Sequence, residues 1–233
     1  MARAKRFYLP GLTWHITQRC HKKEYLLGLE CHRDIWLHWL EKANNRFDIS
    51  ILNYMITSNH IHLLVMDGYE DCSIANSMQL VSGRMAQEYN NRNNRSGSFW
   101  GDRYHATAVQ ENNHLFNCMM YIDTNMVRAG KVKHPKEWTY CGYQEIEGLK
   151  QQNTLIDKRK LAELLEVEES ELRSFYNEML REYMANSGMK REPRWTESIA
   201  VGQRPFVEAI KAALGDKAKK RKIENHDDYS VLK

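Results

Sequence analysis

Hydrophobic and polar positions alternate along several short stretches of the N-terminal half, and this alternation predicts β-strands. Residues 14–18 run Trp-His-Ile-Thr-Gln, and their alternation and their β-branched and aromatic residues favour a strand. Residues 49–57 and 60–66 are two further apolar runs separated by a Ser-Asn pair, which is typical of a turn and predicts a hairpin. Residues 99–110 mix aromatic and β-branched residues with basic ones, which predicts a fourth strand.

Apolar residues at helical spacing lie between and after these strands. Residues 29–47 carry apolar side chains three and four positions apart among charged ones, the pattern of an amphipathic helix. Ser73 is a suitable N-cap for a second helix, which ends at the polar run 90–97. A third helix is expected from about 112 to 128, with Gly130 placed to end it. This order of elements predicts an α+β fold, a ferredoxin-like antiparallel sheet covered by helices.

Three regions are expected along the chain. The α+β domain occupies residues 1–148, and residues 149–215 form a small helical extension. Residues 216–233 open with a run of lysine and arginine and are too polar to bury a core, so we expect a basic, polar and flexible tail. The helices expected within the extension cover residues 161–167, 172–184 and 195–214.

The composition is that of a folded soluble protein. Hydrophobic residues make up 42% of the chain and charged residues 27%, which is enough apolar material for a core. The five cysteines are odd in number and lack the spacing of a zinc or redox motif, so we expect them to be reduced. No apolar stretch is long enough to cross a bilayer and no signal-peptide core follows the first residues, which predicts a cytoplasmic location and no membrane partner. The net charge of +4 is too small to identify a nucleic-acid partner, so local motifs must decide.

His60 and His62 are two residues apart in a predicted strand. Strand alternation directs both side chains to one face, roughly 6.5–7 Å apart along the strand, so both can reach one metal ion. Such a pair also arises by chance on half-buried strands, where the imidazoles are simply hydrogen-bonded. The pair therefore needs corroboration from elsewhere in the sequence.

Corroboration comes from the third predicted helix. Tyr121, Asn125 and Arg128 lie at i, i+4 and i+7, which aligns a phenol, an amide and a guanidinium on one helix face. Apolar residues elsewhere on this helix can supply the contacts with the core. The polar stripe is thus available for chemistry.

Together these residues resemble the REP-associated tyrosine transposases, within the HUH class of single-tyrosine transposases. The HUH element of that family is similar to His60-Ile61-His62, and its tyrosine-bearing helix is similar to Tyr121-Ile122 with Asn125 through Gly130. The resemblance covers roughly residues 3–148, with further similarity at Leu9-Pro10-Gly11, at His15 through Arg19 and at Gly97 through Tyr104. The chain departs from the family at Met126, where a proline is common, and at Asp123-Thr124, where His-Leu is frequent. These departures remove no reactive group, but they leave the local helix geometry and the DNA preference open.

The resemblance implies that His60, His62 and Asn125 are metal ligands and that Tyr121 is the nucleophile. Two imidazoles and an amide suit Mg²⁺ or Mn²⁺. The implied reaction is cleavage of single-stranded or hairpin DNA through a covalent 5′-phosphotyrosine, followed by strand transfer to a 3′ hydroxyl. The family's substrates are repetitive extragenic palindromic hairpins. Its REP-associated members favour a monomer over a dimer for this chain.

Basic residues near these motifs are candidates for contacts with DNA phosphates, and Tyr104 or Trp100 for stacking on an unpaired base. Each of them also fits an ordinary solvated charge or core aromatic, and the lysine-rich run 217–222 fits a solubilising tail as well as a DNA-binding arm. The basic candidates are Arg3, Lys5, Arg6, Arg19, Arg84, Arg92, Arg95, Arg103 and Arg128.

Two other functions remain open at the level of sequence. The chain could be a catalytically inactive regulator that binds hairpin DNA, although every expected reactive residue is present. It could also be a metal hydrolase acting on a small molecule, which would use water and not Tyr121.

Overall fold

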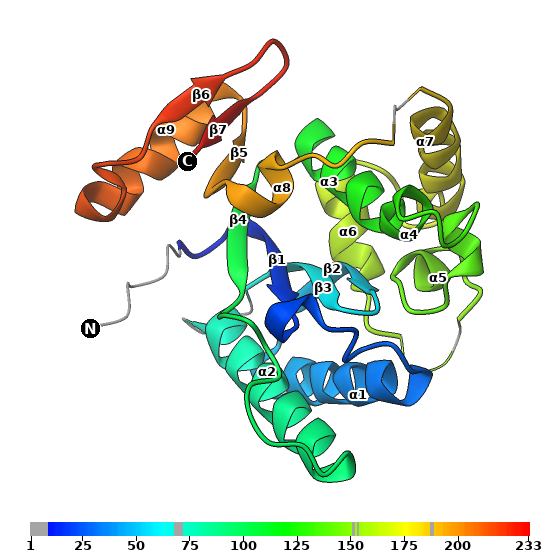
Figure 1. Ribbon diagram of the computed structural model, residues 1–233. Helices are drawn as coiled ribbons and strands as arrows, with labels where there is room; N and C mark the ends of the chain where they lie inside the picture. Colours follow the sequence, from blue (N-terminus) through cyan, green and yellow to red (C-terminus); the bar gives the residue numbers. More distant parts are fainter. Residues whose placement is uncertain (1–8, 68–71, 151, 153, 187–188) are drawn as a thin grey trace.

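The structure is a computed structural model that describes residues 9–67, 72–150, 152, 154–186 and 189–233. Its first part has the order strand, helix, strand, strand, helix, strand (Figure 1). The strands β2, β3, β1 and β4 are neighbours in that order and pair antiparallel. This is the ferredoxin-like topology, and the predicted α+β class is confirmed. The elements are β1 (Thr13–Arg19), α1 (Glu30–Phe47), β2 (Ser50–Ile56), β3 (His60–Met66), α2 (Ser73–Arg92) and β4 (His105–Val109).

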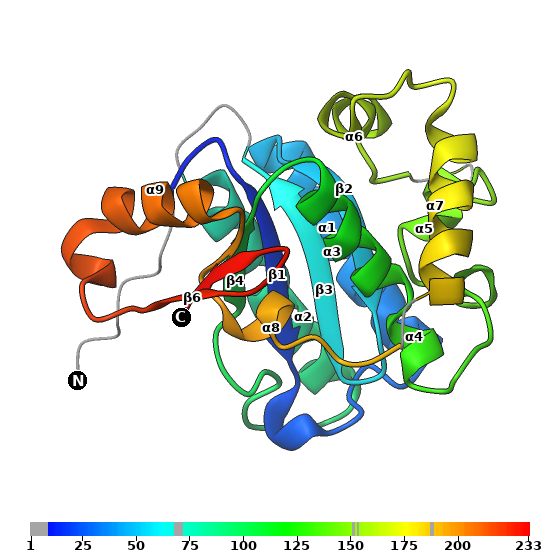
Figure 2. The same cartoon turned by 90° about the horizontal axis from the view of Figure 1, so that it is seen from above.

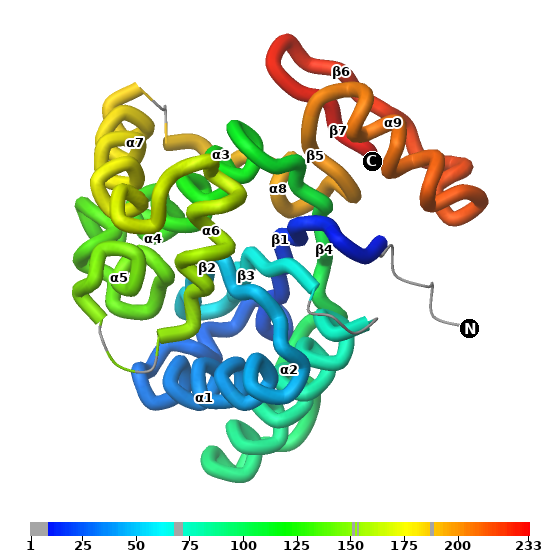
Figure 3. Tube along the Cα trace, turned by 180° about the vertical axis from the view of Figure 1, so that it is seen from behind, coloured from blue at the N-terminus to red at the C-terminus, as the bar shows by residue number. Residues whose placement is uncertain are grey.

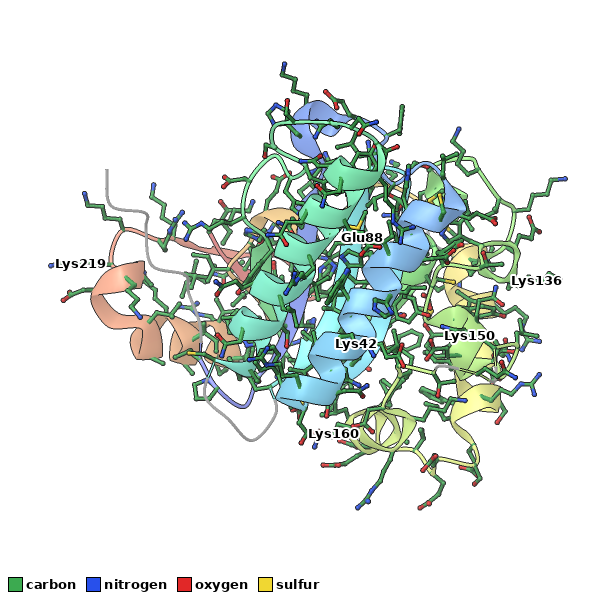
Figure 4. All side chains as sticks on the ribbon, turned by 90° about the horizontal axis from the view of Figure 1, so that it is seen from below. Lys42, Glu88, Lys136, Lys150, Lys160 and Lys219 are labelled. Atoms are coloured by element: carbon green, nitrogen blue, oxygen red, sulfur yellow. The ribbon has the colours of Figure 1, made fainter. Side chains whose placement is uncertain are left out.

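Helices α1 and α2 cover one face of this sheet (Figures 1 and 2). The two helices lie side by side over the sheet in Figure 4, in which Lys42 labels α1 and Glu88 labels α2. The side chain of Gln18 on β1 accepts a hydrogen bond from Ser82 on α2, so the even-numbered residues of β1 point to this side. Trp14 and Ile16 are fully buried there, and their apolar surface holds the helix pair to the sheet.

The opposite face of the sheet is covered by α3 (Asn113–Asp123) and the short α4 (Asn125–Arg128). The predicted helix 112–128 is therefore interrupted at Thr124, although the backbone N–H of Arg128 still donates to the Thr124 carbonyl. Gly130 ends α4 as predicted. It has φ of +65° and its N–H donates to Val127, a conformation that glycine adopts without strain.

The outer edge of β2 is covered by later segments of the chain. The N–H of Ile56 donates to Tyr140, the N–H of Gly142 donates to Tyr54, and the N–H of Asp157 donates to Ile51. These bonds occupy backbone groups that would otherwise be open to another strand. The segments around them hold the 3₁₀ turn η2 (Pro135–Glu137) and the helices α5 (Tyr143–Ile146), α6 (Lys158–Leu165) and α7 (Leu172–Asn186). Two further 3₁₀ turns are η1 (His21–Lys23), which follows β1, and η3 (Gly215–Ala218) in the C-terminal region.

The C-terminal region extends the sheet beyond β4, at the edge opposite β2. The sequence instead predicts a helix over residues 195–214 and a flexible tail over residues 216–233. Strand β5 pairs parallel with β4, and β7 and β6 follow, giving seven strands in the order β2-β3-β1-β4-β5-β7-β6. Figure 3 shows this C-terminal unit, with α9 packed against its strands. None of the helices in the described ranges is long and apolar enough to cross a membrane. The elements are α8 (Arg194–Glu197), β5 (Ala200–Gly202), α9 (Arg204–Leu214), β6 (Ile223–Asn225) and β7 (Ser230–Leu232).

Physical reasons account for these differences. Residues 195–214 divide into two helices and a strand because Ala200 and Val201 add to the edge of β4, and Pro205 then sits in the first turn of α9, where proline is tolerated. Residues 216–233 form structure because Val231 and Leu232 are buried in the sheet and Ser230 and Ala218 are buried as well, while most of the other residues of this segment stay exposed. The predicted strand 99–110 is confined to β4, since the residues before it form a loop that meets the end of β1 at an isolated bridge between Trp100 and Cys20 and at the hydrogen bond from Gly101 to the Arg19 carbonyl.

Helix α7 is tied to the core by a buried carboxyl group. Asp123 is fully buried, and burial raises the pKa of its carboxyl to about 7. Its oxygens accept hydrogen bonds from Asn53 of β2, at 3.1 Å, and from the phenol of Tyr176 of α7. A buried carboxyl group needs such donors, so this network fixes the place of α7 on the core.

Replacement of Tyr176 by phenylalanine is expected to lower the free energy of unfolding by about 1–3 kcal/mol, because it leaves the buried Asp123 carboxyl with one donor fewer. Urea denaturation measures this change. Tyr140→Phe is the matched control, since it removes an exposed hydrogen bond to Asp34 and should cost less than about 0.5 kcal/mol. Equal effects of the two substitutions would contradict a structural role for the network.

Candidate active site

Two histidines of β3 lie on the sheet face that α3 covers. His60 and His62 are two residues apart, and their rings meet edge to face with centroids 5.0 Å apart. His62 is buried and His60 is half-buried. Burial lowers the pKa of His60 to about 3 and holds the pKa of His62 well below its usual range. Both imidazoles are therefore neutral near pH 7, which is the form that binds metals.

The hydrogen bonds of His60 fix its tautomer. Its Nδ1 lies 2.7 Å from Oδ1 of Asn59 and 2.9 Å from the hydroxyl of Thr57. The amide of Asn59 is oriented because its Nδ2 donates to the carbonyl of Lys23, and the Thr57 hydroxyl donates to the His60 carbonyl. Both side-chain oxygens therefore accept from Nδ1–H. In a neutral ring this leaves an unprotonated lone pair on Nε2.

His62 is oriented by a second histidine, His15 of β1. Nε2 of His15 lies 2.9 Å from Nδ1 of His62, and the two rings are inclined by only 7° with centroids 5.1 Å apart. The contact is therefore edge to edge, as a hydrogen bond in the ring plane requires. Nδ1 of His15 lies 2.8 Å from the backbone carbonyl of Trp195 in α8. Burial lowers the pKa of His15 to about 3, so this ring is neutral as well.

Asn125, the first residue of α4, completes this group of side chains. Its Nδ2 lies 3.0 Å from Nε2 of His62, and half a turn of the carboxamide would present its oxygen there. Among the residues that the structure describes, no three His, Cys, Asp or Glu side chains are grouped so that they could hold a metal ion. A cation at this site would need the amide oxygen as a third ligand. Two imidazole lone pairs and one amide oxygen suit Mn²⁺ or Mg²⁺.

Tyr121 lies beside the histidines at the end of α3. Its ring centroid is 5.9 Å from that of His62 and 6.4 Å from that of Trp195. The guanidinium of Arg128 lies over the ring, 4.1 Å from its centroid, and donates to the Thr124 hydroxyl at 2.6 Å. Burial raises the pKa of Tyr121, and the positive charge of Arg128 opposes that rise. The phenol is therefore held in place by a cation that favours its ionised form.

These side chains open into one cleft of about 680 Å³. Its lining includes six cationic side chains and one carboxylate, that of Asp102. This excess of positive charge attracts a polyanion. Three predicted DNA contacts are among the six, and the others were not predicted from the sequence. The six are Arg19, Lys22, Lys23, Arg103, Arg128 and Arg191.

The remaining predicted DNA contacts lie elsewhere. Arg84 is on α2, where it lines a separate cleft of about 730 Å³ beside α1 and lies over the ring of Trp39. Tyr104 is partly buried against the core. Trp100 is buried and its indole N–H donates to the Ser82 carbonyl. It is therefore closed to a stacking base, contrary to the prediction. Arg92 pairs with Glu88, Arg95 bonds to Asn90 and Ser98, and Arg3, Lys5 and Arg6 lie outside the described residues.

Comparison with known proteins agrees with this geometry. The family model of IS200-like transposases matches residues 9–125, just over half of the 233-residue chain. The chain belongs to the IS200-like transposases. The matched region begins before β1 and ends at Asn125, so it spans the histidine pair, Tyr121 and the first residue of α4. This transposase adds a C-terminal region that contributes Trp195 to the same site.

One solved structure has the same fold as this chain, and a second aligns less well. One is described as a REP-associated tyrosine transposase bound to a REP hairpin, and it aligns with a TM-score of 0.52 at 17% identity, over 64% of this chain and 86% of that one. Another is a putative transposase from Deinococcus radiodurans R1, at 16% identity over 47% of this chain and 88% of that one, with a TM-score of 0.36. No curated protein matches the chain significantly.

Proposed function

We propose that this transposase cuts single-stranded DNA by attack of Tyr121 on a phosphodiester and transfers the cut end to a second strand. The observation that carries this proposal is the position of the Tyr121 ring, 5.9 Å from the ring of His62 inside a basic cleft. His62, Asn125 and Tyr121 come from one copy of the chain, so the site is complete without a partner. This supports a monomer as the active unit.

The proposed metal ligands are His60, His62 and Asn125. Their hydrogen bonds support this role, because Nδ1 of each histidine is occupied, which puts the lone pair on Nε2. At His62 that lone pair faces the Asn125 amide, which would turn its oxygen toward a cation. A divalent cation held there would neutralise the charge that builds up on the phosphate during attack. Neutral ligands leave the full charge of Mg²⁺ or Mn²⁺ available for that purpose.

The proposed reaction exchanges one phosphoester bond for another. The phenol oxygen of Tyr121 forms a bond to phosphorus while the bond from phosphorus to the 3′ oxygen breaks. The phenol loses its proton and the departing 3′ oxygen gains one. Attack by the 3′ hydroxyl of a second strand then reverses these changes and releases Tyr121, so no nucleotide is consumed. Strand transfer is therefore favoured over simple hydrolysis.

Arg128 is proposed to assist the nucleophile. Its guanidinium lies against the ring of Tyr121 and lines the cleft, so its charge stabilises a phenolate and attracts a phosphate. Its donation to Thr124 keeps it over the ring. We found no carboxylate or imidazole bonded to the phenol in the described residues, which leaves water to receive the proton.

Hairpin DNA is the proposed substrate. The solved transposase bound to a REP hairpin shares the fold of this chain, and the resemblance in the HUH and tyrosine motifs supports repetitive extragenic palindromic hairpins. The cleft is basic enough to hold a single strand next to such a hairpin. An inactive hairpin-binding regulator is the second candidate, and the next experiment separates the two.

Incubation of the protein with a labelled single-stranded hairpin and Mn²⁺ is expected to yield a covalent protein–DNA adduct on a denaturing gel. Tyr121→Phe removes the phenol oxygen, so the adduct should disappear while the noncovalent complex on a native gel remains. Tyr104→Phe is the matched control and should form the adduct. A native protein that shifts the hairpin without forming an adduct would support the regulator, and an adduct in Tyr121→Phe would exclude Tyr121 as the nucleophile.

Mn²⁺ binding tests the ligands separately from catalysis. Replacing His60, His62 or Asn125 by alanine removes one ligand and should weaken Mn²⁺ binding by more than about tenfold. Electron paramagnetic resonance of free Mn²⁺ measures the affinity. His38→Ala, an exposed histidine of α1, should bind Mn²⁺ like the native protein. Unchanged affinity in all three ligand variants would reject this metal site.

Salt dependence tests the basic cleft. Arg19 is exposed on the cleft wall, and Arg19→Gln should reduce the slope of log affinity against log salt by about 0.7, the loss of one phosphate contact on single-stranded DNA. The lysines of the tail are the comparison, because Lys219 points away from the body of the protein (Figure 4). The variant with Lys219→Gln and Lys220→Gln should keep the native slope, and a reduced slope there would identify the tail as a DNA-binding arm.

A further inference from the structure

The C-terminal region reaches the proposed metal site through one line of hydrogen bonds. The carbonyl of Trp195 in α8 accepts from Nδ1 of His15 at 2.8 Å. Nε2 of His15 lies 2.9 Å from Nδ1 of His62, whose own Nε2 faces Asn125 at 3.0 Å. This line crosses from α8 to β1 and from β1 to β3. It therefore joins residue 195 to a side chain in the first third of the chain.

The direction of each bond follows from the atom at its start. A carbonyl oxygen only accepts, so the proton of the neutral His15 lies on Nδ1 and its Nε2 carries a lone pair. Nδ1 of His62 must then donate, which leaves the lone pair of His62 on Nε2. The N–H of the Asn125 amide donates to that lone pair, in agreement with this assignment. The carbonyl of Trp195 thus determines which nitrogen of His62 carries the lone pair.

The Trp195 carbonyl is itself held firmly in place. The side chain of Trp195 is fully buried. The guanidinium of Arg194 lies 4.7 Å from the centroid of the Trp195 ring and 4.1 Å from that of the Tyr229 ring. Thr107 of β4 donates to the carbonyls of Ser198, at 2.7 Å, and Trp195, at 3.3 Å. Strand pairing of β5 with β4 fixes the following residues. The C-terminal unit is therefore a rigid support for the first bond of the line.

We propose that His15 is a positioning residue and that the Trp195 carbonyl, acting through it, holds His62 in the tautomer that binds the metal. The C-terminal unit is then a working part of the active site, because its Trp195 carbonyl fixes the proton of His15 on Nδ1. This inference rests on the proposed function, since it takes His62 as a metal ligand. We call this line of hydrogen bonds, from the Trp195 carbonyl through His15 to His62, the relay. It predicts that any side chain at residue 15 that accepts a hydrogen bond at the position of Nε2 preserves metal binding.

Three substitutions of His15 test the relay. His15→Phe removes both nitrogens, and His15→Asn keeps a donor for Trp195 but is too short to reach His62. Both should weaken Mn²⁺ binding by about 10–100-fold, the usual effect of losing a hydrogen-bond partner of a metal ligand. His15→Gln can place its amide oxygen near the position of Nε2 and should restore most of the affinity. Equal Mn²⁺ affinity of His15→Phe and the native protein would overturn the proposal.

Thr107→Val is the matched control for docking alone. It removes the threonine bonds to the carbonyls of Trp195 and Ser198 and keeps the hydrogen bonds of His15 and His62. It should lower thermal stability and leave Mn²⁺ affinity nearly native. An equal loss of affinity in Thr107→Val and His15→Phe would show that His15 acts only by docking α8, and would overturn the relay.

Nitrogen-15 NMR of the metal-free protein reads the tautomer directly. The native protein should show His62 protonated on Nδ1, and His15→Phe should give a mixture of the two tautomers. His62 protonated on Nε2 in the native protein, or an unchanged signal in His15→Phe, would overturn the relay. This measurement needs no metal, so it is independent of the proposed function, which fails separately if the native protein does not bind Mn²⁺.

Discussion

The need to satisfy buried imidazoles is the constraint on which this structure depends. Strands β1 and β3 lie inside the sheet and are covered on both faces, and the face under α1 and α2 is apolar in these strands except for Gln18. The other face carries His15 and His62, both buried. An unpaired polar group in such a place costs several times the net gain from a hydrogen bond. Each ring nitrogen of the pair therefore has a partner, and those partners decide which nitrogen of His62 carries the proton and which the lone pair.

This constraint explains why a transposase domain with a ferredoxin-like sheet carries so much chain after it. Removal of α8 would leave Nδ1 of His15 without its acceptor and would uncover the edge of β4. The added strands β5, β7 and β6 provide the acceptor and cover that edge together. At the opposite edge, β2 is covered by residues 140–142 and 156–157. Both edges of the four-stranded unit are thus covered within one chain, which favours a site that works in a single copy.

The sequence predicts those parts of the fold and site that depend on local periodicity. Alternation of two places His60 and His62 on one face, and helical spacing aligns Tyr121 with Asn125 and Arg128. The break at Thr124 does not spoil that alignment, because the backbone bonds across it keep the helical path. The short strands β5, β6 and β7 have three residues each, too few for alternation to be recognised. The polar residues between and around β6 and β7 resemble a solvated tail until the pairing of these strands is known.

His15 could not be assigned from the sequence, because its partners lie 47 and 180 residues away and nothing local marks them. Its one visible signal is that it is a titratable residue between apolar and β-branched neighbours, at residues 13–17 of a strand. Such a residue needs a partner in a folded protein. Arg191 and Lys23 reach the cleft from segments with no regular pattern, so their signal is weaker still. Local rules therefore locate the groups that are proposed to react, whereas the groups that orient them come from pairing between distant segments, which only the folded chain brings together.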